Sequence, residues 1–75
     1  MDAMTTHEEI VWDRDHAASG WRDRAFVEPF ELIVYDEGDW EVRGPPLGDT
    51  VAHGEEKDAE EARKRCLKVW AALAD

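Results

Sequence analysis

The sequence predicts an α+β domain, in which a three-stranded antiparallel sheet is followed by one C-terminal helix packed on one of its faces (βββα). Its 75 residues suffice for one small domain, and an apolar content of 43% is enough to build a core. The β-favouring apolar runs all precede residue 50, whereas helical periodicity is confined to the last segment of the chain. Consecutive strands usually pair with each other, which favours a meander.

The N-terminal part of the chain contains one predicted strand. Residues 1–8 are polar and unpatterned, which is typical of a flexible terminus, and the predicted domain covers residues 9–75. Residues 10–12 (Ile-Val-Trp) form a short β-favouring run, and residues 16–20 are predicted as a loop. Residues 21–27 fit either a strand or an ordered loop held by a tryptophan.

A β-hairpin is the clearest feature of the sequence, with strands at residues 30–35 and 40–43. A two-residue turn would place Val34 opposite Glu41. A three-residue turn with Gly38 in the left-handed region instead pairs Val34 with Trp40. The second register separates apolar from polar side chains far better, and we predict it. The face toward the helix is then Phe30, Leu32, Val34, Trp40 and Val42.

The C-terminal segment predicts an amphipathic helix over residues 58–74. Residues 44–48 (Gly-Pro-Pro-Leu-Gly) must form a loop, and residues 50–52 are a short extended piece at best. Asp58 with Glu61 forms a capping-box pattern at the helix start. At about 100° per residue, one narrow arc contains an apolar stripe, which we expect to face the sheet. The stripe consists of Ala59, Ala62, Cys66, Val69, Trp70 and Leu73.

The charge and cysteine content exclude several classes of protein. The net charge of −10 makes binding to nucleic acid or to an anionic membrane unfavourable, because both require positive charge facing phosphate. No apolar run is long enough for a membrane span, and no basic segment precedes an apolar one as in a secretory signal. A single cysteine excludes a disulfide and is typical of a cytoplasmic protein.

No residue pattern indicates catalysis or a cofactor. Cys66 lies within the apolar helix stripe, and Ser19 near His16 lacks the glycine pattern of a nucleophile elbow. The histidines and the cysteine lack the spacing of zinc ligands. Prolines occupy the one glycine-flanked loop, where a phosphate would require amide donors. We therefore expect a protein that is not an enzyme and carries neither metal nor cofactor.

The distribution of charge suggests a binding surface. Residues 57–75 carry five basic and four acidic residues, whereas residues 1–56 carry four arginines and fifteen acids. The excess negative charge therefore lies on the sheet and its loops, where it either solvates the surface or contacts a basic partner protein. The hairpin presents the candidate contact residues Glu31, Ile33, Tyr35, Asp36, Glu37, Asp39 and Glu41. A second interpretation is a structural adaptor that binds through Ile33 and Tyr35 on the open sheet face, as in a homodimer.

In size, acidity and its strand-rich start followed by one helix, the chain resembles the small acidic accessory proteins of bacteriophages and mobile elements. Some inhibitors of CRISPR systems in that group present acids in place of nucleic-acid phosphates. The resemblance implies an inhibitor that occupies the basic, nucleic-acid-binding surface of a partner protein. It assigns no individual residue a role.

Overall fold

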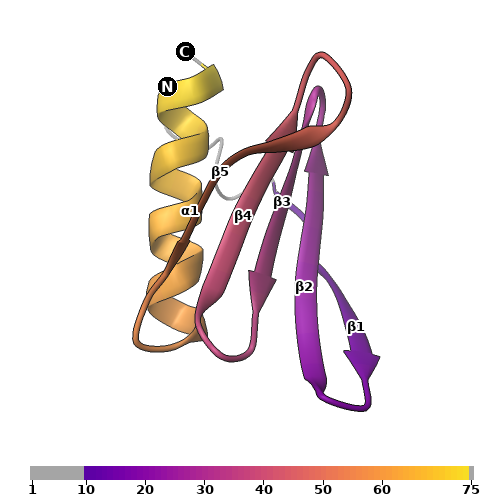
Figure 1. The fold of residues 1–75 in the computed structure, drawn as a ribbon, viewed down its shortest axis with the longest axis vertical. Coiled ribbons are helices and arrows are strands. Elements are labelled where there is room, and N and C mark those ends of the chain that lie inside the picture. Colours follow the sequence, from indigo (N-terminus) through magenta and orange to yellow (C-terminus); the bar gives the residue numbers. More distant parts are fainter. Residues whose placement is uncertain (1–9, 75) are drawn as a thin grey trace.

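The computed structural model describes residues 10–74, so the predicted flexible segment at residues 1–8 lies outside the described part. The described residues form an antiparallel sheet and one C-terminal helix, as predicted (Figure 1). Helix α1 lies on one face of the sheet, where it contacts β3, β4 and β5. The elements are β1 (Asp13–Ala17), β2 (Gly20–Val27), β3 (Phe30–Tyr35), β4 (Asp39–Gly44), β5 (Asp49–Glu55) and α1 (Ala59–Ala74).

The sheet has five strands in the order β1-β2-β3-β4-β5, so the prediction of three strands was wrong. Residues 10–12 are not a strand, and the first strand instead begins at Asp13 and includes part of the predicted loop. The ambiguous residues 21–27 belong to β2, and residues 50–52 lie within the seven-residue strand β5. Ile10 and Trp12 nevertheless pack against the core, as their apolar character suggests.

The register of the β3–β4 hairpin is confirmed. Val34 lies opposite Trp40 and Leu32 opposite Val42. Gly38 has a φ of 108°, a backbone conformation that side chains rarely adopt, and its N–H donates to the Tyr35 carbonyl at 3.0 Å. A Cβ at Gly38 would overlap the carbonyl oxygen of Glu56. Glycine is therefore required both by the turn and by the close approach of the chain before α1.

Helix α1 begins as the capping-box pattern predicts. The Asp58 carboxylate accepts the Glu61 N–H at 2.9 Å, which satisfies one of the amides at the helix start. Ala62, Cys66 and Trp70 are buried against the sheet. Leu73 is 43% exposed, so its predicted inward packing was wrong: its position falls in the last turn of the helix, beyond the buried Trp70.

The core lies between α1 and the helix side of the sheet. Leu32, Val34 and Val42 are fully buried there with Cys66, and Trp40 and Trp70 are each 6% exposed. Gly54 lies opposite Trp40, and a Cβ at this glycine would overlap the indole ring. Small residues on β5 thus make room for the large ones on β4. The other side of the sheet, called the open face below, is not covered by α1 and carries the candidate contact residues of the hairpin.

Candidate functional site

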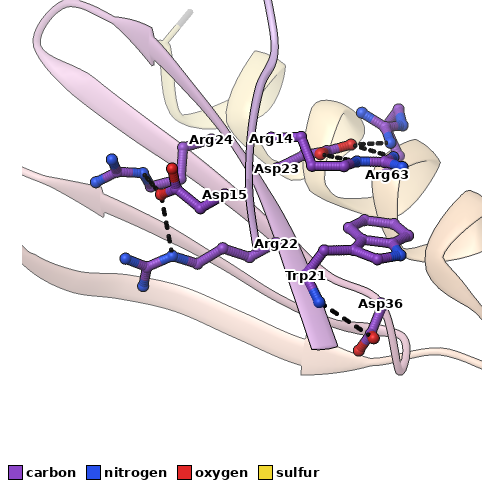
Figure 2. A network of polar contacts seen from close by, with 8 residues as sticks. All are labelled: Arg14, Asp15, Trp21, Arg22, Asp23, Arg24, Asp36 and Arg63. Atoms are coloured by element: carbon purple, nitrogen blue, oxygen red, sulfur yellow. Dashed lines mark hydrogen bonds and ion pairs between the residues drawn. The ribbon is translucent and has the colours of Figure 1, made fainter. Parts of the chain in front are cut away.

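Three acids on the open face, Asp15, Glu31 and Glu41, are neutralised by arginines of the same chain. Asp15 lies between Arg22 and Arg24, with N–O distances of 3.6 Å and 3.1 Å. Arg24 also reaches the Glu31 carboxylate at 3.6 Å. Figure 2 shows these ion pairs of Asp15. On the other side of β1 and β2, it shows the ion pairs that Asp23 makes with Arg14 and Arg63. Glu31, a predicted contact residue, is therefore already engaged within the protein.

Glu41 is engaged even more fully. Its carboxylate accepts hydrogen bonds from Arg43 at 2.7 Å, from the Thr50 hydroxyl at 2.8 Å and from the Tyr35 hydroxyl at 3.3 Å. Burial raises the pKa of this carboxyl group, but the bonds from Arg43 and Thr50 outweigh burial and leave the pKa lowered. Both Glu41 and Tyr35 are thus held in place by contacts within the sheet.

Two further predicted contact residues have structural roles. Ile33 lies on the open face but is only 2% exposed, so it packs there and offers little apolar surface to a partner. Asp36 accepts the Trp21 N–H at 3.2 Å and its own N–H donates to the Trp21 carbonyl at 3.0 Å. A Cβ at Gly20 would overlap the Asp36 carboxylate, so glycine permits this contact. Asp36 therefore fixes the start of β2 against the β3–β4 turn.

The remaining predicted acids, Glu37 and Asp39, have no cation within ion-pair distance in the part of the chain that the structure describes. The same is true of Glu55, which the sequence did not single out. Asp39 lies directly opposite Glu55 across β4 and β5. We call Asp39 and Glu55 the β4–β5 acidic pair.

The register places the two residues of this pair at a close cross-strand position. The Glu56 N–H donates to the Gly38 carbonyl at 2.8 Å. Since hydrogen-bonded and non-hydrogen-bonded positions alternate along an antiparallel ladder, Asp39 and Glu55 occupy a non-hydrogen-bonded position. Side chains at such positions are the closest across a sheet, and like charges there are destabilising. We therefore expect the β4–β5 acidic pair to lower the stability of the free protein.

The acidic pair opens into a shallow hollow on the open face. Tyr35 forms one wall of this hollow and His53 lies beside the acids. The complete lining is Tyr35, Asp39, Trp40, Glu41, Thr50, His53, Gly54 and Glu55. An aromatic wall next to carboxylates suits the side chain of an arginine or a lysine, which can pack its stem on the ring and place its charge on the acids.

The helix side of the sheet contains an ion-pair network that the sequence did not predict. Asp23 is 3% exposed, and its carboxylate accepts two bonds from Arg14, at 2.7 Å and 3.0 Å. Arg63 on α1 donates to the same carboxylate at 2.6 Å (Figure 2). The two bonds from Arg14, assisted by the one from Arg63, lower the pKa of Asp23 against the opposing effect of burial. The sequence feature that could have revealed this network is Asp23 itself, an acid within the alternating segment 21–27.

Two tryptophans complete this network. The Arg14 guanidinium lies 3.7 Å from the centroid of the Trp21 ring, and that of Arg63 lies 4.7 Å from the Trp12 ring. Each arginine therefore has a carboxylate at its donors and an aromatic face beneath it, which holds the guanidinium plane in place. This arrangement joins β1, β2 and α1, and we interpret it as structural.

The chemistry available to Cys66 is limited by its surroundings. The thiol is fully buried and donates to the Glu41 carbonyl at 3.8 Å. Burial raises its pKa to about 12, so the reactive thiolate is scarce at neutral pH. Within residues 10–74, no group of three or more His, Cys, Asp or Glu side chains is arranged to hold a metal ion.

Comparisons with protein-family models, with curated proteins and with solved structures found no match to this chain. Across residues 10–74, no helix has the length and apolar character needed to cross a membrane.

Proposed function

We propose that this protein is a non-catalytic binding module that contacts a basic surface of a partner protein through the β4–β5 acidic pair and Glu37. The observation that carries the proposal is the contrast between two sets of acids on one face. Asp15, Glu31 and Glu41 are neutralised within the chain, whereas Asp39 lies opposite Glu55 and neither has a cation within ion-pair distance among residues 10–74.

A basic partner would relieve this repulsion. Like charges held together by the fold raise the free energy of the unbound protein, and a cation from a partner would convert the repulsion into attraction. Surface residues that reduce stability are frequently retained for function. The net charge of −10 would also speed the encounter with a positively charged protein.

The class of partner we propose is a nucleic-acid-binding protein. Its surface for phosphates carries closely spaced arginines and lysines, which is the chemistry that a close pair of carboxylates would recognise. The protein would then act as an inhibitor that competes with DNA or RNA, as the resemblance to phage and mobile-element proteins such as anti-CRISPR inhibitors implies.

The experiment compares two double variants that change the net charge equally. A pull-down from the native host supplies the partner, and stopped-flow fluorescence then measures the association rate at several salt concentrations. We expect Asp39→Asn with Glu55→Gln to slow association and flatten its salt dependence. The matched control, Asp15→Asn with Glu31→Gln, removes acids that are already paired and should have a smaller effect.

A second measurement addresses inhibition directly. If the partner surface is a nucleic-acid site, the nucleic acid and this protein will compete for it, and the wild-type protein will displace a labelled oligonucleotide. Equal effects of the two double variants would mean that net charge alone matters. Such a result, or unchanged binding of the Asp39/Glu55 variant, would contradict the proposed site.

A further inference from the structure

Strand β5 is an edge strand with little protection against pairing. It ends the sheet, and among residues 10–74 no strand lies along its outer side. Natural edge strands commonly carry charges or proline, which discourage a further strand from adding. The opposite edge fits this rule, since Asp13, Arg14 and Asp15 are consecutive in β1. In contrast, β5 has acids only at its two ends, Asp49 and Glu55, and residues 50–54 between them are Thr-Val-Ala-His-Gly, with neither a proline nor a lysine, arginine or acid.

The orientation of the backbone shows which groups of β5 face outward. The Glu56 N–H points toward β4, where it donates to the Gly38 carbonyl. Backbone groups of successive residues in a strand point alternately to its two sides. The N–H and C=O groups of Glu55 and His53 therefore point away from β4, toward the open edge.

We infer that β5 accepts an extended segment of the basic partner as a sixth, antiparallel or parallel, strand. This inference rests on the proposed function, because charge identifies the occupant. A strand added at this edge would run beside Glu55, whose carboxylate is exposed and lies opposite Asp39. Its basic side chains on the open face would thus meet the β4–β5 acidic pair while its backbone bonds to His53 and Glu55.

The two sides of β5 differ, which predicts the pattern of the bound segment. On the open face, an added strand would lie next to the side chains of Glu55 and His53. On the helix side its neighbours would be the small residues Gly54 and Ala52, which lie next to Trp40 and Val42. Since side chains alternate between the faces of a strand, the partner segment should alternate basic residues with small apolar ones. The ladder between β4 and β5 shifts register at Val42/Arg43, so the regular edge runs from Ala52 to Glu55 and the added strand is short.

A second copy of this chain fits the edge less well. Each copy carries a net charge of −10, which opposes self-association. If two β5 strands paired antiparallel about Ala52, Asp49 of each copy would lie opposite Glu55 of the other. Acids would then face each other at both ends of the new ladder, which is destabilising.

The test uses two synthetic octapeptides of identical composition, both blocked at their ends and labelled with fluorescein. One alternates arginine with valine, and the other has its arginines in one block followed by the valines. Fluorescence anisotropy gives the affinity of each for the full-length protein. We expect the alternating peptide to bind about tenfold more tightly, since it alone combines backbone pairing with charge contacts.

Two variants at His53 distinguish the contribution of its backbone N–H from that of its side chain. His53→Pro removes the outward N–H, and His53→Ala keeps it. We expect the proline variant to bind both peptides equally and the alanine variant to retain the preference. Amide hydrogen exchange of wild-type protein provides a readout that does not depend on whether the proline variant folds. Exchange at His53 and Glu55 should slow when the alternating peptide is bound.

Any of the following results would overturn strand addition at β5. If both peptides bind equally and Asp39→Asn with Glu55→Gln weakens both, the acidic surface is used without strand addition, and the proposed function survives. If exchange at His53 and Glu55 is unchanged by the bound alternating peptide, the peptide lies elsewhere. If neither peptide binds, the inference fails, whereas the association rate with the native partner still tests the proposed function. A stable dimer in sedimentation, lost in His53→Pro, would assign the edge to a second copy.

Discussion

Arg63 on α1 donates to the buried carboxylate of Asp23 on β2 at 2.6 Å, across a separation of 40 positions in the sequence. The same carboxylate accepts the two bonds from Arg14 on β1. One side chain therefore connects the first strand, the second strand and the helix. It occupies the helix side of β2, in the row that also contains the buried Ala25.

Asp23→Ala should lower the free energy of unfolding by about 2–3 kcal/mol. This is less than the ~3–5 kcal/mol typical of a broken buried pair, because Arg14 and Arg63 retain partial contact with water. Urea denaturation monitored by tryptophan fluorescence measures the loss. Asp15→Ala is the matched control, since its ion pairs are exposed and should contribute about 1 kcal/mol or less. Equal losses for the two variants would contradict the central role of Asp23.

The stability of the protein should fall in acid, partly through Asp23. Its pKa is lowered in the folded state, chiefly by the bonds from Arg14, whereas the unfolded chain has a value of about 3.9. The folded state therefore binds fewer protons, and the contribution of Asp23 is complete above that value and is lost as the pH falls through the folded pKa. The pKa of Glu41 is also lowered in the folded state, so this carboxylate contributes to the acid sensitivity in the same way. Denaturation curves measured from about pH 7 to about pH 2 should show that the free energy of unfolding falls more steeply for wild type than for Asp23→Ala. If the two proteins lose stability in parallel, Asp23 does not contribute to the acid sensitivity.

The parts of the fold that the sequence predicted correctly are those with strong local signals. Gly38 and the apolar row through Val34 and Trp40 define the hairpin register within a short window. Asp58 and the apolar stripe define α1 in the same way. The strands that were missed, or left open as strand or loop in the case of residues 21–27, lack such signals. In β2 the inward row is interrupted by Asp23, whose compensating arginine is 40 positions away, and in β5 the inward residues are small.

The candidate site was predicted in part for the same reason. Glu37 and Asp39 belong to the hairpin and were identified with it. Glu55 was missed because β5 was not recognised as a full strand, so its position opposite Asp39 was hidden. The neutralisation of Glu31 was equally hidden, since Arg24 lies on β2, which the sequence left ambiguous.

Cys66 should report global unfolding of the protein. Its thiol is fully buried and its pKa is raised to about 12 by burial, so a thiol reagent can react only when the structure opens. We expect modification by Ellman's reagent at mildly alkaline pH to be at least about a thousandfold slower in the native protein than in urea-denatured protein, given typical domain stabilities. As this is the single cysteine of the chain, the absorbance change needs no further assignment. Comparable rates in the two states would contradict the burial.

The apolar stripe of α1 should divide energetically between its buried and its exposed members. Trp70 is 6% exposed and Leu73 is 43% exposed. Trp70→Ala should therefore cost about 3–5 kcal/mol, which is enough to unfold a small domain. Leu73→Ala should cost less than about 1 kcal/mol, as is usual for residues largely outside the core. Thermal unfolding followed by circular dichroism compares the two, and a larger loss for Leu73→Ala would overturn the orientation of the helix.

The β4–β5 acidic pair should make the protein less stable than it would otherwise be. Replacing Asp39 with Asn and Glu55 with Gln removes the repulsion between two carboxylates at a close cross-strand position, so the free energy of unfolding should rise by about 0.5–1 kcal/mol. The gain should shrink at high salt, which screens the charges in wild type. Asp15→Asn with Glu31→Gln should instead lower stability slightly, because it breaks favourable pairs with Arg24. The two double variants have the same net charge. Changes of opposite sign in their free energies of unfolding would therefore show that local repulsion, and not net charge, is responsible. A loss of stability in the Asp39/Glu55 variant would mean that these acids stabilise the free protein, and the argument for a basic partner would lose its support.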